Sequence, residues 1–188
     1  MKNMKKTMAL LLAVVLLVGV AVGATIAWLT AETPEVKNTF TTSSIGVALN
    51  ESTTQYKMIP GWTIAKDPKV NVTADSEDCY LFVKVTESEN FKSFMTYAIA
   101  DGWTKLSDGV YYRIFDSNDS ENANVKGTAY SVLKGDKVTV LDNVTKENMA
   151  ALTDATKPTL TFQAYACQLY KSNTTKFEPA EAWAKVVP

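Results

Sequence analysis

Four oxygen-bearing side chains stand close together in the stretch 116–124, whose sequence is DSNDSENAN. Asp116, Asn118, Asp119 and Glu121 offer the hard oxygen ligands that Ca²⁺ prefers. The stretch has no glycine at its sixth position and no glutamate at its twelfth, so it is not an EF-hand loop. We therefore interpret it as a solvated hairpin loop and predict neither a metal site nor a cofactor.

Groups for the common catalytic mechanisms are scarce. The 188 residues include no histidine, which excludes Ser-His-Asp and Cys-His catalysis and any histidine-ligated metal site. No cluster of the remaining carboxylates and cysteines has the spacing of zinc ligands. Glu87 and Glu89 lie in the polar stretch TESEN, which predicts a turn and not the paired carboxylates of a glycosidase. We predict no catalytic residue and no enzyme.

The two cysteines, Cys79 and Cys167, leave two interpretations open. In an oxidising compartment they would form a disulfide, which across so long a loop would stabilise the fold by about 2–4 kcal/mol. Alternatively, both are small buried hydrophobic residues. The sequence cannot decide, because it does not show whether their strands are neighbours.

Four aromatic residues, Trp62, Trp103, Tyr111 and Tyr112, are candidates for a binding surface. Aromatic residues that alternate along strands more often form the core and cross-strand pairs. We favour the core, and keep a subunit interface and a carbohydrate site as alternatives.

The beginning of the chain has the pattern of an export signal. Three lysines among the first seven residues precede an uninterrupted apolar run over residues 8–22, and small residues follow. Thr25 and Ala27 suit the two recognition pockets of a signal peptidase, so we predict a signal peptide over 1–27 and a mature chain that starts at Trp28. An uncleaved signal anchor is the alternative, since the run reaches about 20 residues when it is extended through Leu29.

Charge restricts the partners of the mature chain. The whole chain has 19 basic and 20 acidic residues, and residues 1–27 hold three lysines and no acid, which leaves a net charge of −4. An acidic domain has no basic face for nucleic acid and no electrostatic attraction to an anionic membrane. We expect membrane contact only through an uncleaved signal segment.

Short alternating strands dominate the remainder. In the run CYLFVKV, residues 79–85, the first residue and every second one after it fall on one face, and Met95, Tyr97 and Ile99 repeat this pattern. Two short helices are predicted, one from Thr145 through Leu152 and one from Pro179 to Lys185. We expect an N-terminal arm over 28–43 and, over 44–188, an all-β, antiparallel, jelly-roll-like β-sandwich with one or two short helices.

Several ordered segments resemble one family of exported proteins. The junction TIAWLT followed by NTFTTSSIGVAL is similar to the start of chains that are processed by a SipW-type signal peptidase. The segment KMIPGWTIAKDPKVNVTADSEDCYLFVKV, and later GVYYRIF, AYACQ and EAWAKV, resemble the TasA/camelysin family. This resemblance implies a jelly-roll sandwich that is secreted to the extracellular matrix or cell surface of a Gram-positive bacterium. It also implies a structural role, as a subunit of biofilm-matrix fibres.

An open sandwich can polymerise because its edge strands carry unpaired backbone groups. An arm that begins with Trp28 and Leu29 would add a strand to the edge of a neighbouring copy, and such a head-to-tail contact makes a filament if it does not close. We therefore expect a homopolymer or a polymer of related matrix subunits. A monomeric surface adhesin or ligand-binding module is the alternative, and a camelysin-type metalloprotease is a third, weaker one.

Overall fold

The structure is a computed structural model that describes residues 43–53 and 56–187. These residues belong to one compact unit, Thr42–Pro188. Two predicted segments lie outside the described residues. They are the signal peptide, with its recognition residues Thr25 and Ala27, and the beginning of the arm, with Trp28 and Leu29. No helix within residues 43–53 and 56–187 is long and apolar enough to cross a membrane.

One layer of the fold is a four-stranded antiparallel sheet. Its strands are β4 (Cys79–Glu87), β6 (Thr104–Ser107), β7 (Val110–Phe115) and β10 (Leu160–Gln168). They are ordered β10-β4-β7-β6, so β10 and β6 are the edges. The central strand β4 is buried almost throughout, because it has a neighbour on each side and side chains packed on both faces.

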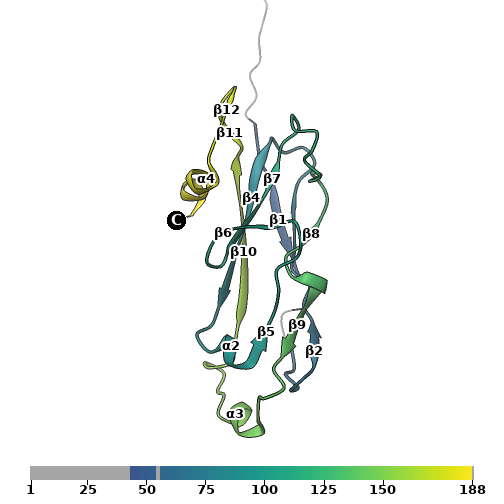
Figure 1. Cartoon of the computed structure of the whole chain (residues 1–188), viewed down its shortest axis with the longest axis vertical. Helices are drawn as coiled ribbons and strands as arrows, with labels where there is room; N and C mark the ends of the chain where they lie inside the picture. Colours follow the sequence, from purple (N-terminus) through teal and green to yellow (C-terminus); the bar gives the residue numbers. More distant parts are fainter. Residues whose placement is uncertain (1–42, 54–55, 188) are drawn as a thin grey trace, which may run out of the picture. The chain divides into compact units, whose positions relative to one another are not determined.

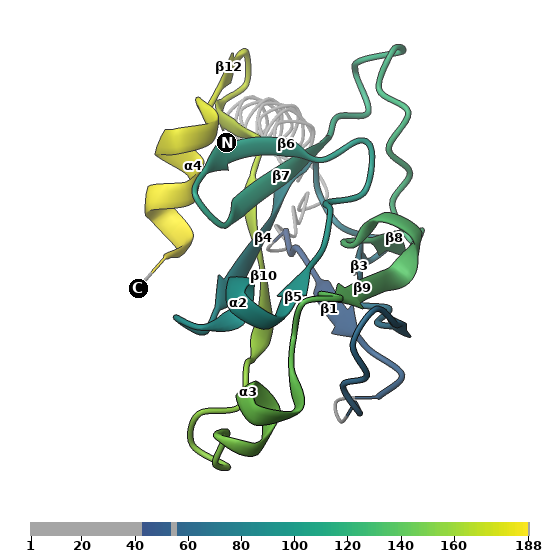
Figure 2. The same cartoon turned by 60° about the horizontal axis from the view of Figure 1, so that its bottom comes forward.

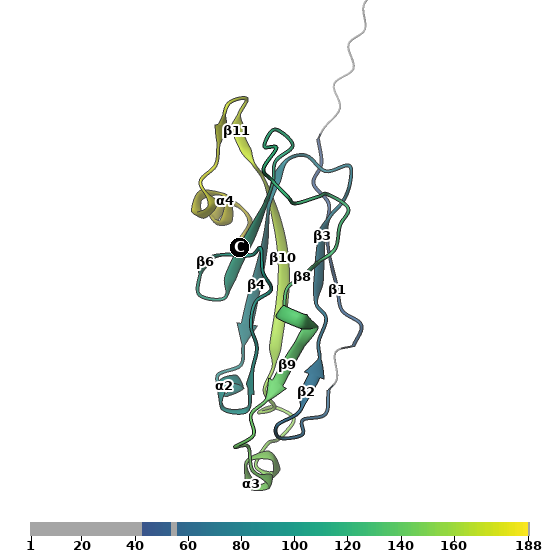
Figure 3. The same cartoon turned by 45° about the vertical axis from the view of Figure 1, so that its right-hand side comes forward.

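Two three-stranded sheets make the opposite layer, ordered β1-β3-β8 and β2-β9-β5 (Figure 3). All their pairs are antiparallel. The strands are β1 (Val47–Asn50), β2 (Thr63–Ala65), β3 (Lys69–Val72), β5 (Met95–Thr96), β8 (Tyr130–Ser131) and β9 (Lys137–Val140). The all-β, antiparallel sandwich that the sequence predicted is therefore confirmed, whereas the jelly-roll topology stays a prediction.

Short helices and one hairpin complete the unit. Thr145 caps helix α3 (Lys146–Ala150) through a reciprocal pair of hydrogen bonds with Asn148, and Pro179 opens helix α4 (Pro179–Val186). Both helices were predicted. The 3₁₀ turn η1 (Lys134–Asp136) precedes β9, and the hairpin β11 (Tyr170–Ser172) and β12 (Thr175–Lys176) precedes α4.

The structure of the segment 91–99 differs from the strand that the alternation of Met95, Tyr97 and Ile99 predicted. Its first residues form a helix, α2 (Phe91–Phe94), and only Met95 and Thr96 pair as a strand with β9. Ile99 makes a single isolated bridge to Leu133. The rings of Phe91 and Tyr97 pack edge to face, so this turn is held by core packing that an alternating pattern does not reveal.

The core is divided by the four-stranded sheet. The inner cluster lies between the two layers and includes Cys79, Leu81, Val83 and Val85 of β4, as the alternation predicted. The outer cluster lies on the other face and includes Tyr80 and Phe82 of β4 and Ala182 of α4. Figure 2 shows α4 beside the four-stranded sheet. Trp183 of α4 packs on this outer face, 5.3 Å from the ring of Phe82.

The two cysteines do not form a disulfide. Both are buried free thiols in neighbouring strands, where Cys79 pairs with Gln168 and Cys167 pairs with Tyr80. This one-residue offset places Cys79 in the inner cluster and Cys167 in the outer cluster. Because their side chains leave opposite faces of the sheet, no disulfide can join them without moving the backbone. The second interpretation, two small buried hydrophobic residues, is confirmed.

Candidate functional site

Along the side of β10, no strand pairing among the described residues joins the two layers. Within the described residues, β10 pairs only with β4, while β1 pairs only with β3 and β2 only with β9. A cavity of about 1050 Å³ lies between these unpaired edges. We call it the edge groove; it is lined by Leu49, Glu51, Tyr56, Met58, Ile64, Lys66, Phe91, Met95, Val138, Met149, Leu152, Lys157, Pro158, Thr159, Leu160, Thr161 and Phe162.

Most of the residues that line the edge groove are apolar, and the sandwich leaves several of them partly uncovered. Met58, Ile64, Leu152 and Leu160 pack against the inner cluster but stay partly exposed. Leu49 of β1 is 37% exposed. A strand placed between β10 and the opposite layer would cover these side chains and would pair with unsatisfied backbone groups at the edge. The groove therefore places apolar side chains beside an unpaired strand edge.

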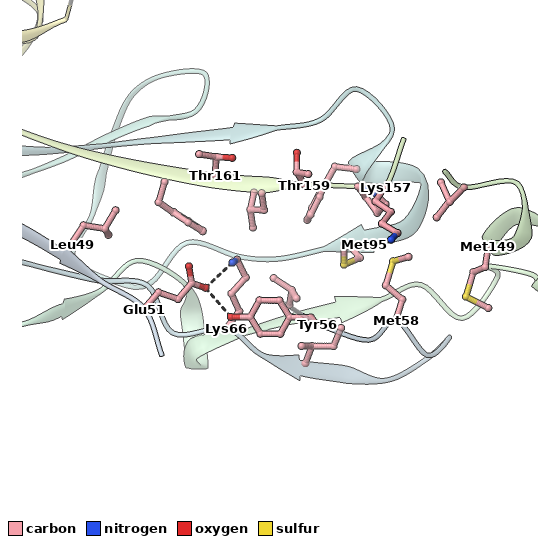
Figure 4. Close-up of a pocket in the computed structure, with 17 residues that line it drawn as sticks. Leu49, Glu51, Tyr56, Met58, Lys66, Met95, Met149, Lys157, Thr159 and Thr161 are labelled. Carbon is pink, nitrogen blue, oxygen red and sulfur yellow. Dashed lines mark hydrogen bonds and ion pairs between the residues drawn. The ribbon is translucent and has the colours of Figure 1, made fainter. Parts of the chain in front are cut away.

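One polar cluster lies inside this apolar wall, and Figure 4 shows its three side chains pointing toward one another. The Lys66 ammonium is 2.6 Å from Glu51 Oε1, and the Tyr56 hydroxyl donates to the same oxygen at 2.9 Å. Lys66 is only 7% exposed and also lies over the rings of Tyr56 and Phe162. The pairing and the aromatic faces compensate the burial of the charge.

The surroundings of Tyr56 keep its hydroxyl a hydrogen-bond donor to Glu51. Burial, and then the hydrogen bond to Glu51, raise the pKa of Tyr56 above its usual value, so the hydroxyl stays protonated and donates. The only hydrogen bond of the Lys66 side chain within the described residues is the one to Glu51. An ammonium carries three N–H groups, so an oxygen of a peptide in the groove can accept another.

The stretch 116–124 is a loop, and its first carboxylate is held by the protein itself. Asp116 is 6% exposed; its carboxylate lies 2.5 Å from the Lys176 ammonium and accepts hydrogen bonds from the Tyr170 hydroxyl and the backbone N–H of Asn118. Burial acts to raise the pKa of Asp116, but these partners outweigh it, and the pKa lies below its usual value. Asp119 accepts from the backbone N–H of Glu121, as turn residues do. No group of three or more metal-ligating side chains gathers in the part of the chain that the structure describes.

The predicted aromatic candidates do not share one surface. Trp62 is 62% exposed in the turn before β2, whereas Trp103 packs on Arg113 with 4.9 Å from guanidinium to ring. Tyr111 packs against the inner cluster and Tyr112 against the outer one. Three of the four thus lie in the packed body of the unit, as we favoured, and only Trp62 projects from it.

The candidate carboxylates are likewise separate. Glu87 ends β4, where it accepts a hydrogen bond from the Tyr97 hydroxyl at 2.8 Å and pairs with Lys92 at 3.3 Å. Glu89 lies in the turn that follows. These contacts give Glu87 a structural role at the end of the strand.

Comparison with known protein families, with curated proteins and with solved structures found no match to this chain.

The edge groove is a site that sequence reasoning missed. Its walls come from segments far apart in the chain, namely 49–66, 91–95, 138, 149–152 and 157–162. One signal was present: a lysine, Lys66, follows directly on the apolar residues Ile64 and Ala65. A buried lysine is uncommon and must find a partner.

Proposed function

We propose that this chain is an exported structural subunit of a bacterial surface or matrix fibre, in which the N-terminal arm of one copy fills the edge groove of the next. The observation that carries the proposal is the edge groove itself: a cavity of about 1050 Å³, with a mostly apolar lining, beside the unpaired edge of β10. Isolated unpaired edges are a liability that proteins normally cover. A strand from another copy is the occupant that covers both the edge and the apolar wall.

The positions of the arm's attachment point and of the groove support a head-to-tail arrangement. The described chain begins at the end of the unit marked by β11 and β12, and α3 lies at the opposite end (Figures 1 and 3). The groove opens beside α3, since Met149 and Leu152 line it. Because the donor segment and the acceptor are different surfaces, repetition of the contact extends a filament instead of closing a dimer.

The arm has the length and composition that the groove requires. Residues 28–42 precede the described unit and span up to roughly 50 Å when extended. They carry the apolar side chains of Trp28, Leu29 and Val36, which a neighbour's groove would bury. Export and cleavage by a SipW-type signal peptidase would free this arm, which fits the resemblance to the TasA/camelysin family.

Complementary variants test the proposal. Leu49→Lys places a charge in the groove at a side chain that is 37% exposed, so the variant should fold but should not accept an arm. Val125→Lys is the matched control, since Val125 is 60% exposed and does not line the groove. In electron microscopy of the chain that starts at Trp28, we expect fibres from the control and none from Leu49→Lys.

Mixing completes the test. A chain that lacks residues 28–36 retains a groove but no donor, and Leu49→Lys retains a donor but no groove. Each should be monomeric alone, and the mixture should give one-to-one dimers that do not grow, measured by analytical ultracentrifugation. Fibres from Leu49→Lys, or a mixture that stays monomeric, would reject this mode of assembly.

A further inference from the structure

The methionines of this protein have an uneven distribution. The sequence contains six, and Met1, Met4 and Met8 belong to the predicted signal peptide. The other three, Met58, Met95 and Met149, all line the edge groove, although they come from the segment before β2, from β5 and from α3. Figure 4 shows them together toward one end of the groove. The mature chain thus carries its whole methionine content at one site.

The three thioethers differ in their access to solvent. Met58 and Met149 are partly exposed at the margin of the inner cluster, whereas Met95 belongs to the cluster itself and is 9% exposed. Oxidation of a thioether to a sulfoxide converts a flexible apolar side chain into a polar one. A sulfoxide in the groove would lose its hydration when a donor strand covered it, and burying a polar group without a partner is unfavourable.

We propose, on the basis of the fibre function above, that the edge groove is an oxidant-responsive site: oxidation of Met58 and Met149 by a peroxide prevents a donor arm from binding. The thioether sulfur attacks one peroxide oxygen, the O–O bond breaks and an S–O bond forms. The second oxygen leaves as water with both peroxide protons. Each sulfur is oxidised by two electrons and the peroxide is reduced by two, so no further reactant is required.

The cysteines do not compete for the oxidant in this fold. The thiolate is the reactive form, and burial raises the pKa of Cys79 to about 12. Burial also raises the pKa of Cys167, which is 8% exposed. Both stay protonated thiols at neutral pH, so the partly exposed thioethers of Met58 and Met149 react first.

The same geometry predicts protection by assembly. An arm in the groove covers Met58 and Met149, and these sulfurs should react more slowly in fibres than in monomers. Peptide mass mapping after a short exposure to hydrogen peroxide measures this directly, since each sulfoxide adds the mass of one oxygen atom.

The experiment compares assembly of the chain that starts at Trp28 before and after treatment with hydrogen peroxide. We expect treatment to raise the critical concentration for fibres about tenfold or more. The double variant Met58→Leu, Met149→Leu conserves side-chain volume, so it should fold and assemble, and its critical concentration should change less than twofold on treatment. Met95→Leu is the matched control and should remain as sensitive as the unmodified chain.

The outcomes separate the two proposals. If the untreated chain forms no fibres, the proposed function fails and this inference fails with it. If the untreated chain assembles and the oxidised chain assembles equally well, only the oxidant response is overturned. Equal inhibition of the double Leu variant would also overturn it, because the effect would then come from other residues.

Discussion

Phe82 tests whether α4 covers the outer face of the four-stranded sheet. Its side chain is fully buried, with ring centroids 5.7 Å from Tyr80, 6.1 Å from Tyr112 and 5.3 Å from Trp183. Replacing a buried phenylalanine by alanine removes its transfer free energy and leaves a cavity. Phe82→Ala should therefore lower the free energy of unfolding by about 3–5 kcal/mol. For a unit of this size, that corresponds to a fall in Tm of roughly 6–20 °C.

A double-mutant cycle isolates the contact with α4. We expect Phe82→Ala and Trp183→Ala to couple by about 0.5–1.5 kcal/mol, the range for an aromatic pair in contact. Urea unfolding followed by circular dichroism gives the four free energies without relying on tryptophan fluorescence.

The matched control is Phe115, which is equally buried but faces the inner cluster. Phe115→Ala should be as destabilising as Phe82→Ala, yet additive with Trp183→Ala within about 0.5 kcal/mol. Coupling of Phe82 with Trp183 below that margin would refute the packing of α4 on the outer face.

Three further predictions concern a carboxylate, the thiols and a turn. Asp116 has a lowered pKa in the folded state, so its pairing stabilises the fold above about pH 4 and is lost as the pH falls through that lower pKa. Asp116→Asn should lower the free energy of unfolding at neutral pH by about 1–2 kcal/mol; the loss is modest because Lys176 is half exposed and solvent screens its charge. The variant should also lose less stability than the unmodified chain as the pH falls. Identical losses of stability in acid would contradict this. Because both cysteines are buried free thiols, a reducing agent should leave the Tm unchanged. A thiol reagent should label two cysteines in urea but none in the folded protein within the same time. A Tm that falls on reduction would indicate a disulfide. Gly102→Ala should lower the free energy of unfolding, measured with urea, by about 1–3 kcal/mol. The reason is that φ of Gly102 is +85° and an added Cβ would lie 2.6 Å from Arg113 Nη1. An unchanged urea midpoint would show that the turn adapts.

Much of the local structure could be predicted because local patterns specify it. The alternation of β4 has a period of two, and burial on both faces follows from the apolar residues at nearly every position. The start of α3 follows from Thr145, whose side chain accepts from the backbone N–H of Asn148, and the start of α4 follows from Pro179. Such signals act over three or four residues and need no partner from elsewhere in the chain.

The segment 91–99 shows where this reasoning fails. Met95, Tyr97 and Ile99 alternate as a strand does, but only Met95 and Thr96 find a partner in β9. A strand exists only where a second strand offers its hydrogen bonds, and the alternation carries no information on where that partner ends. Helix α2, which precedes Met95, begins without a capping hydrogen bond from a side chain.

The sequence by itself determined that the chain is an antiparallel all-β protein, where two of its helices begin, and which residues of β4 share a face. It also fixed a composition without histidine and with three methionines beyond the predicted signal peptide. Only the tertiary structure decided that Cys79 and Cys167 leave opposite faces, because a register offset of one residue reverses the direction of every side chain. Only the tertiary structure assembled the edge groove, because its walls meet through the packing of two layers whose strands are far apart in the chain.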